Sequence, residues 1–265
     1  DILPYRIQPD GNLVYCNTVG THGTNPVHLV LDRSGKWLYV ANLQTGAVSL
    51  IPVLEDGSLG KIKELYFISG NGGPGYISHP HQTMLDRSGR WLAVPSQGRL
   101  QGVGKITLFK GRTGAEPRHC VFAPSNRFCY CVNEKDSTVA AYRFDENEGT
   151  LEPMQILTSL PEDYAGDGWA SAIDMDAEGK TLYVSNRKHD SVSVYHLDAE
   201  TGRMSWMQNI KTGGEQPRFL TVSPDGEWVA AANEVTDTIV CFKRNENGSL
   251  QENPVVVETE SPVCI

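Results

Sequence analysis

The chain lacks any run of about 18 apolar residues, the length that a membrane-spanning helix requires. It also lacks a surplus of basic residues, because 23 lysines and arginines stand against 32 aspartates and glutamates and the net charge is −9. Nucleic-acid surfaces need clustered positive charge. We therefore expect a protein with neither a membrane nor a nucleic-acid partner.

Cysteine is scarce and has no metal-site spacing. The six cysteines are Cys16, Cys120, Cys129, Cys131, Cys241 and Cys264. They form no C-x-x-C pair, and the spacing of Cys129 and Cys131 is poorly suited to structural zinc. Most lie in apolar, strand-like segments, where a thiol behaves as a small hydrophobe. We expect buried free thiols, with disulfides or a metal as the alternatives, and a reducing, cytoplasmic location.

Three catalytic signatures are also missing. The chain has no G-x-S-x-G element, so an acyl-enzyme is not favoured. It has no H-x-x-x-H element and no acidic cluster, so no catalytic metal is indicated. We expect neither a metal nor another cofactor.

What the chain does contain is one sequence unit written five times. The copies are anchored at Pro26, Pro80, Pro117, Ala170 and Pro217. Gly or Asn follows nine residues after each anchor, Asn or Ser follows sixteen residues after it, and an apolar run such as Trp37–Ala41 lies between them. The copies recur every 37 to 54 residues, and each predicts three or four strands. This period is typical of a β-propeller, so we predict an all-β fold of that type.

The repeats continue without a linker, which predicts a single domain over residues 1–265. The predicted units lie near 26–79, 80–116, 117–169, 170–216 and 217–265, with 1–25 as the tail of an earlier unit. Val255–Val257 and Ser261–Ile265 are predicted as strand-like segments after the last unit. The second unit is the shortest and lacks an Asp-Gly-x-Leu element near Gly98–Arg112. We expect a seven-bladed parent with about one blade missing or incomplete in this chain.

Two positions break the repeat pattern. The residues one past each anchor are Val27, His81, Arg118, Ser171 and Arg218, and those seventeen past are Leu43, Gln97, Glu134, Arg187 and Glu234. If equivalent positions face a central channel, their charges converge there, which predicts an active site. The alternative is that they are solvated loop residues or that the arginines pair with a neighbouring blade. His119 directly follows Arg118, so on a regular strand it should point to the other face.

The same residues carry a family resemblance. The motifs are Ser78–His81, Pro117–His119, Val132–Val139, Val184–Ser191 and Gly213–Phe219. With them the chain resembles the lactonase family of seven-bladed propellers, which includes 6-phosphogluconolactonases, and more distantly the carboxymuconate-lactonising enzymes. It departs from the family pattern in Val94–Leu100, where two acidic positions are lost.

The resemblance implies a hydrolase of carbohydrate metabolism whose partner is a small anionic lactone. It implies a catalytic and anion-binding group of His81, Arg118, Glu134 and Arg187. The further substrate-binding residues that we predict are Arg218, His79, Asn133, Asn186 and Glu234.

These residue types suit the opening of a lactone by water. Histidine exchanges protons near neutral pH, so His81 is the preferred proton shuttle. Glu134 is then an orienting carboxylate or the base. Arg118 and Arg187 suit the oxyanion and a carboxylate or phosphate, because a guanidinium binds such groups through paired hydrogen bonds.

Two other functions stay open. A muconate-type lactonising isomerase would use the same arginines, and a non-enzymatic propeller would serve as a binding platform. The platform predicts that Arg118 and Arg187 form salt bridges between blades. A phosphorylated lactone predicts further cations at the pocket mouth, for which Arg99, Lys188 and Lys211 are the candidates.

Overall fold

The computed structural model describes residues 1–68, 77–97, 99–103, 108–109, 111–112 and 114–265. They belong to two compact units, Asp1–Lys110 and Gly111–Ile265, and each is described by itself. The described residues are organised as antiparallel sheets, which confirms the predicted all-β class. No helix in the described ranges has the length and apolar character that a membrane span needs. The assignment of 1–265 to a single domain stays a prediction.

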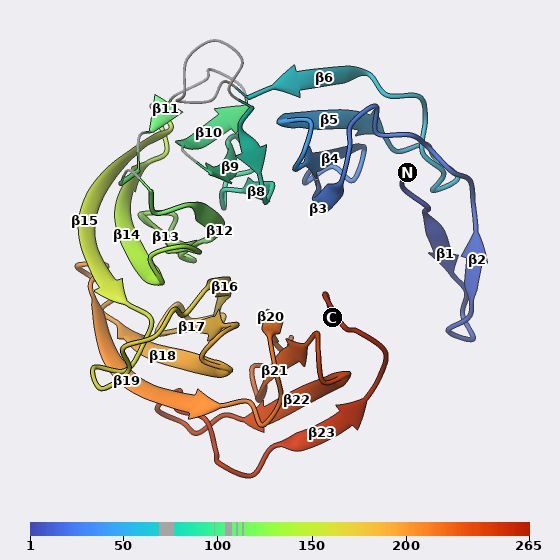
Figure 1. The fold of residues 1–265 in the computed structure, drawn as a ribbon. Coiled ribbons are helices and arrows are strands. Elements are labelled where there is room, and N and C mark those ends of the chain that lie inside the picture. The colour runs from blue at the N-terminus through green and yellow to red at the C-terminus, as the bar shows by residue number, and fades with distance from the viewer. Residues whose placement is uncertain (69–76, 98, 104–107, 110, 113) are drawn as a thin grey trace. The chain divides into compact units, whose positions relative to one another are not determined.

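The first unit contains a hairpin and two larger sheets (Figure 1). The hairpin pairs β1 (Tyr5–Ile7) with β2 (Leu13–Tyr15) and is the structure of the predicted tail segment. The first larger sheet contains β3 (Pro26–Leu31), β4 (Trp37–Asn42), β5 (Ala47–Pro52) and β6 (Glu64–Phe67). The second contains β7 (His79–Pro80), β8 (Met84–Leu85), β9 (Leu92–Gln97), β10 (Arg99–Val103) and β11 (Leu108–Phe109). The two short strands β7 and β8 both pair with β9. Together they occupy the position that a single strand has in the other sheets.

The second unit contains three four-stranded sheets in which each strand pairs with the next (Figure 1). The first contains β12 (Pro117–Phe122), β13 (Phe128–Asn133), β14 (Thr138–Asp145) and β15 (Thr150–Thr158). The next contains β16 (Ala170–Met175), β17 (Thr181–Asn186), β18 (Ser191–Leu197) and β19 (Met204–Lys211). The last contains β20 (Pro217–Val222), β21 (Trp228–Asn233), β22 (Thr238–Lys243) and β23 (Val255–Glu258). Each sheet begins at a predicted anchor residue.

The two predictions for the last segment have opposite outcomes. The strand predicted at Val255–Val257 is confirmed as β23. The strand predicted at Ser261–Ile265 is wrong, since these residues are irregular. The Ser261 amide donates to the Asp237 carboxylate at 2.7 Å, and its φ of 37° is incompatible with an extended strand. The segment near Gly98–Arg112, predicted to lack an Asp-Gly-x-Leu element, lies partly outside the described residues.

In three of the five repeats an aspartate, Asp32, Asp86 or Asp176, fixes the turn between the first two strands. Asp176 Oδ1 accepts the backbone N–H groups of Lys180 at 2.7 Å and Thr181 at 3.1 Å. Asp32 makes the equivalent turn in the first unit. The recurrent position of Gly179, nine residues after its anchor, follows from its φ of 69°, a conformation that glycine adopts without strain. This turn chemistry explains why the repeat can be recognised in the sequence.

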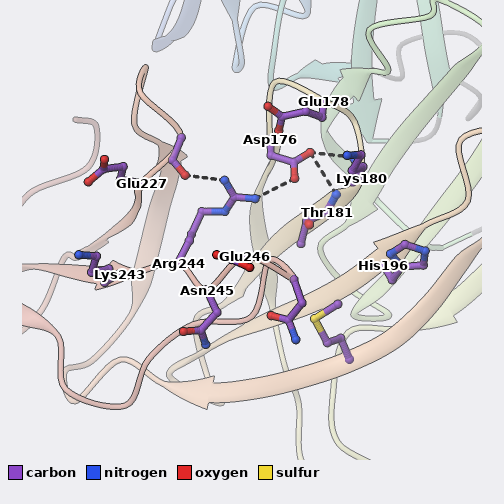
Figure 2. A pocket seen from close by; sticks show the side chains of 13 residues that line it. Asp176, Glu178, Lys180, Thr181, His196, Glu227, Lys243, Arg244, Asn245 and Glu246 are labelled. Carbon is purple, nitrogen blue, oxygen red and sulfur yellow. Dashed lines mark hydrogen bonds and ion pairs between the residues drawn. The ribbon is translucent and has the colours of Figure 1, made fainter.

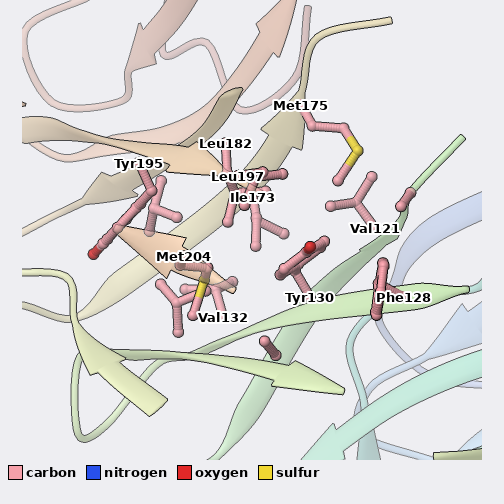
Figure 3. Packing of buried hydrophobic residues seen from close by; sticks show 14 of the residues in the cluster. Val121, Phe128, Tyr130, Val132, Ile173, Met175, Leu182, Tyr195, Leu197 and Met204 are labelled. Carbon is pink, nitrogen blue, oxygen red and sulfur yellow. The ribbon is translucent and has the colours of Figure 1, made fainter. Parts of the chain in front are cut away.

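The core of the second unit lies between its sheets. Figure 3 shows the cluster between the β12–β15 sheet and the β16–β19 sheet, where Tyr130, Leu182 and Tyr195 are almost fully buried. Buried tyrosines need a partner for the hydroxyl. Tyr130 Oη donates to the Gly202 carbonyl at 3.0 Å, and the equivalent Tyr183 donates to the Gly248 carbonyl at 2.7 Å. Each tyrosine therefore links its sheet to a turn of the following sheet.

A buried ion pair reinforces the contact between the last two sheets. Figure 2 shows Arg244 in a hollow of about 730 Å³, with its guanidinium directed at Asp176. Arg244 Nη2 lies 2.8 Å from Asp176 Oδ2, and Arg244 Nε donates to Tyr183 Oη at 2.7 Å. Because these groups satisfy one another, we assign this hollow a structural role.

Replacing Arg244 with methionine is expected to lower the free energy of unfolding by about 3–5 kcal/mol, because the Asp176 carboxylate would stay buried without its partner. Urea denaturation measures the change. The matched control is Arg143→Met, since Arg143 is exposed and lies 3.8 Å from Glu152. Equal effects of the two substitutions would contradict the structural role of the buried pair.

Candidate anion-binding site

A local backbone device brings the two variable positions of each repeat together. The residue before the anchor has a left-handed backbone in four repeats, at Asn25 (φ 58°), Glu116 (58°), Trp169 (47°) and Gln216 (57°). Its carbonyl accepts the N–H of the residue seventeen past the anchor. Glu134 N donates to Glu116 O at 2.8 Å, and Arg187 N donates to Trp169 O at 3.2 Å. The start of the first strand is thereby tied to the end of the second.

A β-bulge re-aims the residue that follows the anchor. The register of β12 on β13 shifts between Pro117 and His119, so Arg118 is the extra residue. Bulges redirect a side chain and are frequent next to functional sites. The prediction that Arg118 and His119 point to opposite faces is wrong, because Arg118 Nη1 lies 3.3 Å from His119 Nε2. Since a guanidinium only donates, His119 Nε2 must accept in this contact.

Arg118, Glu134 and Arg187 form one cluster. Arg118 Nε lies 3.2 Å from Glu134 Oε2, and Arg187 Nη2 lies 2.9 Å from Glu134 Oε1. Both arginines are buried, with exposed fractions of 3% and 6%. Arg118 also donates to the Ser171 carbonyl at 2.8 Å. Two guanidinium groups share one carboxylate, so the cluster retains one positive charge in a largely buried place.

The burial and the neighbouring charges change the pKa of Arg118. Burial lowers the pKa of the Arg118 guanidinium, the charge of Arg187 lowers it further, and Glu134 opposes the change. An unbalanced buried cation is unfavourable, and an anion close to it would relieve this cost. The geometry therefore favours the binding of a negatively charged group.

Arg218 and Glu234 repeat the arrangement in the last sheet. Arg218 Nη1 lies 3.1 Å from Glu234 Oε2, and both side chains are partly exposed. Ser171 Oγ donates to the Arg218 carbonyl at 2.7 Å, which connects this pair to the residue that Arg118 contacts. The charge of Arg218 also contributes to the lowered pKa of Arg118. The assignment of Arg218 and Glu234 to substrate binding stays a prediction.

Both asparagines at the ends of their strands have hydrogen-bond partners. Asn133 Nδ2 donates to Thr138 Oγ1 at 2.9 Å. Asn186 Nδ2 donates to the Ser159 carbonyl at 2.9 Å, and Asn186 Oδ1 accepts from Ser159 Oγ at 2.6 Å. Asn133 thereby spans the turn after its strand, whereas Asn186 links its sheet to the residue after β15. The predicted contact of both asparagines with substrate stays a prediction.

His79 and His81 belong to the first unit. His81 is buried, and its backbone N–H donates to the Pro95 carbonyl at 2.9 Å. His79 Nδ1 lies 3.0 Å from the Leu43 carbonyl and must donate there, because a carbonyl only accepts. Their catalytic and substrate-binding roles stay predictions. The segment that departs from the family pattern is Val94–Leu100. Within it, residue 98 lies outside the described residues, and the side chains of residues 97 and 99–103 are not described either.

All six cysteines are free thiols, and Cys120, Cys129 and Cys131 are buried. Burial is a principal cause of the raised pKa of Cys131, which makes that thiol inert. In the ranges that the structure covers, no group of three or more His, Cys, Asp or Glu residues could hold a metal ion.

The comparisons with known proteins agree on one fold. The family described as "Lactonase, 7-bladed beta-propeller" matches residues 1–265. A 6-phosphogluconolactonase of Bacillus subtilis is 27% identical over 279 residues, which cover 100% of this chain and 79% of the relative. One from Pectobacterium carotovorum is 29% identical, with 94% and 76% covered. The solved structure of a periplasmic gluconolactonase from Pseudomonas aeruginosa superposes with a TM-score of 0.90 at 25% identity, covering 98% of this chain and 78% of that one. The predicted β-propeller fold is thereby confirmed.

Proposed function

Because the chain belongs to the lactonase family of seven-bladed β-propellers, we propose that it is a hydrolase that opens the lactone ring of an anionic sugar acid. We take 6-phosphogluconolactone or a similar sugar lactone as the substrate. The relatives named 6-phosphogluconolactonase and the gluconolactonase structure support this substrate class. The observation that carries the proposal is the pair of buried arginines on one carboxylate, Arg118 and Arg187 on Glu134.

In the proposed reaction, water adds to the ring carbonyl carbon and the carbonyl oxygen becomes an oxyanion. The oxyanion collapses, the bond to the ring oxygen breaks, and the ring oxygen takes a proton to give an open hydroxy acid. Arg118 and Arg187 supply positive charge to the oxyanion or to an acidic group of the substrate. Glu134 holds both guanidinium groups in place, which suits it better to orientation than to proton abstraction. His81 remains the proposed proton shuttle.

One ion pair also supports a second function. Arg187 follows β17 and Glu134 follows β13, so their contact joins two sheets. The sequence predicted such a bridge for a non-enzymatic binding platform. A muconate-type lactonising isomerase would use the same arginines. The arginines therefore do not distinguish it from a hydrolase, and the reaction product has to do so. The cytoplasmic location stays a proposal that rests on the cysteines.

Product identification by NMR separates the three functions. The panel contains 6-phosphogluconolactone, gluconolactone, galactonolactone and a muconolactone, each with spontaneous opening subtracted. A hydrolase yields the open sugar acid faster than buffer does. An isomerase acts on the muconolactone alone. A folded protein that changes no compound at all would support the binding platform and overturn the proposed activity.

A further inference from the structure

Trp169 is placed beside the arginine cluster in a strained backbone conformation. Its φ of 47° is rare for a large aromatic residue, and such strain is concentrated at functional sites. The Trp169 carbonyl accepts both the N–H of Arg187 at 3.2 Å and its Nε at 3.3 Å. The side chain is nevertheless 41% exposed. The backbone of Trp169 thus orients a buried arginine, while its indole is accessible to a ligand.

Two cations share this indole. Lys188 Nζ lies 4.1 Å from a ring centroid of Trp169, and Arg187 Cζ lies 5.5 Å from one. The cationic groups of Arg187 and Lys188 therefore both contact the same side chain. Arg187 is fixed by Glu134, so it marks the buried end of the pair, and Lys188 marks the exposed end.

Lys188 is held only weakly. Its ammonium group also contacts Asp167 at 3.4 Å, and both side chains are well exposed. An exposed ion pair of this kind contributes little to stability, and an exposed cation–π contact is similarly weak. The ammonium group can therefore leave both contacts for a stronger anion.

The other cations predicted for a phosphate are less suitable. Lys211 Nζ donates to the His189 carbonyl at 2.6 Å, which directs it to the backbone. The side chain of Arg99 lies outside the described residues. Lys188 is therefore the cation at the cluster that is exposed, weakly held and next to a buried arginine.

We propose that Trp169 and Lys188 form a phosphate subsite next to the arginine cluster, and that Lys188 is the residue that makes this site prefer a phosphorylated sugar acid. The inference rests on the proposed function and names its substrate class. When the ligand binds, the Lys188 ammonium group leaves Asp167 and the Trp169 indole and contacts the phosphate. The indole that it uncovers then faces the sugar ring. A charge-assisted hydrogen bond of this kind corresponds to about 10- to 140-fold in affinity.

The test measures binding of the open products, so it does not depend on turnover. Calorimetry compares 6-phosphogluconate with gluconate on the wild-type protein and on Lys188→Gln. We expect the wild type to prefer the phosphorylated acid, and the substitution to reduce this preference about tenfold or more. The matched control is Lys135→Gln, because Lys135 occupies the same repeat position and pairs with Glu116 at 3.4 Å.

Three results would overturn the subsite. They are a wild-type protein without the preference, an unchanged preference in Lys188→Gln, and an equal loss in Lys135→Gln. Tryptophan fluorescence provides a second readout, since displacement of Lys188 should change the emission of Trp169 and Trp169→Phe should remove that change. Product binding with the expected preference but no lactone turnover would refute the proposed hydrolase and leave the subsite standing.

Discussion

Replacing Arg187 with glutamine is expected to reduce lactone turnover about 100- to 1,000-fold in a protein that remains folded, because one donor to the oxyanion is lost. Arg118 and Glu134 would stay paired, so the remaining cluster would carry no net charge. Arg187→Lys keeps the charge but loses the paired hydrogen bonds, and it should retain only part of the activity. Steady-state kinetics measure the loss, and circular dichroism melting checks the fold.

The control for this experiment is Arg143→Gln, because Arg143 is exposed and its ion-pair partner is the exposed Glu152. It should retain wild-type turnover. Wild-type turnover in Arg187→Gln would remove that residue from the reaction. If Arg187→Gln instead unfolds, the bridge between the β12–β15 and β16–β19 sheets is structural, which is the result expected of a binding platform.

Glu134→Ala is expected to produce the largest loss of stability in the cluster. Without the carboxylate, two buried guanidinium groups would face each other unpaired, and such a loss typically costs about 3–5 kcal/mol. Inorganic phosphate should restore part of this stability, because an anion that binds only the folded state raises its free energy of unfolding. Urea denaturation with and without phosphate measures both effects.

The surface carboxylate Glu200 provides the comparison, since it lies 3.8 Å from Arg127 and is 89% exposed. Glu200→Ala should change stability little and should show no phosphate rescue. Wild-type stability of Glu134→Ala in phosphate-free buffer would mean that the two arginines do not need a counter-charge. The anion-binding interpretation would then be wrong.

The repeat allowed much of the fold to be predicted. The anchors mark the first residue of β3, β12, β16 and β20, because each begins a strand after a left-handed residue. The glycine nine residues after the anchor could be recognised in the sequence because the turn needs a positive φ. The variable positions also indicated Arg118, Glu134 and Arg187, and the structure brings these three together.

Other features depend on irregular backbone that the pattern does not encode. The period of two along a strand placed His119 opposite Arg118, whereas a bulge brings their side chains into contact. Trp169 stands before its anchor, at a position that reads as an ordinary loop. Only its left-handed conformation and its contacts with Arg187 and Lys188 indicate a functional role. The strand predicted at Ser261–Ile265 failed because apolar composition alone does not supply a pairing partner.

The most direct test of the hydrolase is acid release from 6-phosphogluconolactone and gluconolactone in a pH-stat at neutral pH. The wild-type protein is compared with a buffer blank and with His81→Ala. We expect release well above the spontaneous rate for the wild type, and a loss of about 100-fold or more in the variant, as for removal of a proton-transfer group. Release at the blank rate by folded wild-type protein on both lactones would contradict the proposed function.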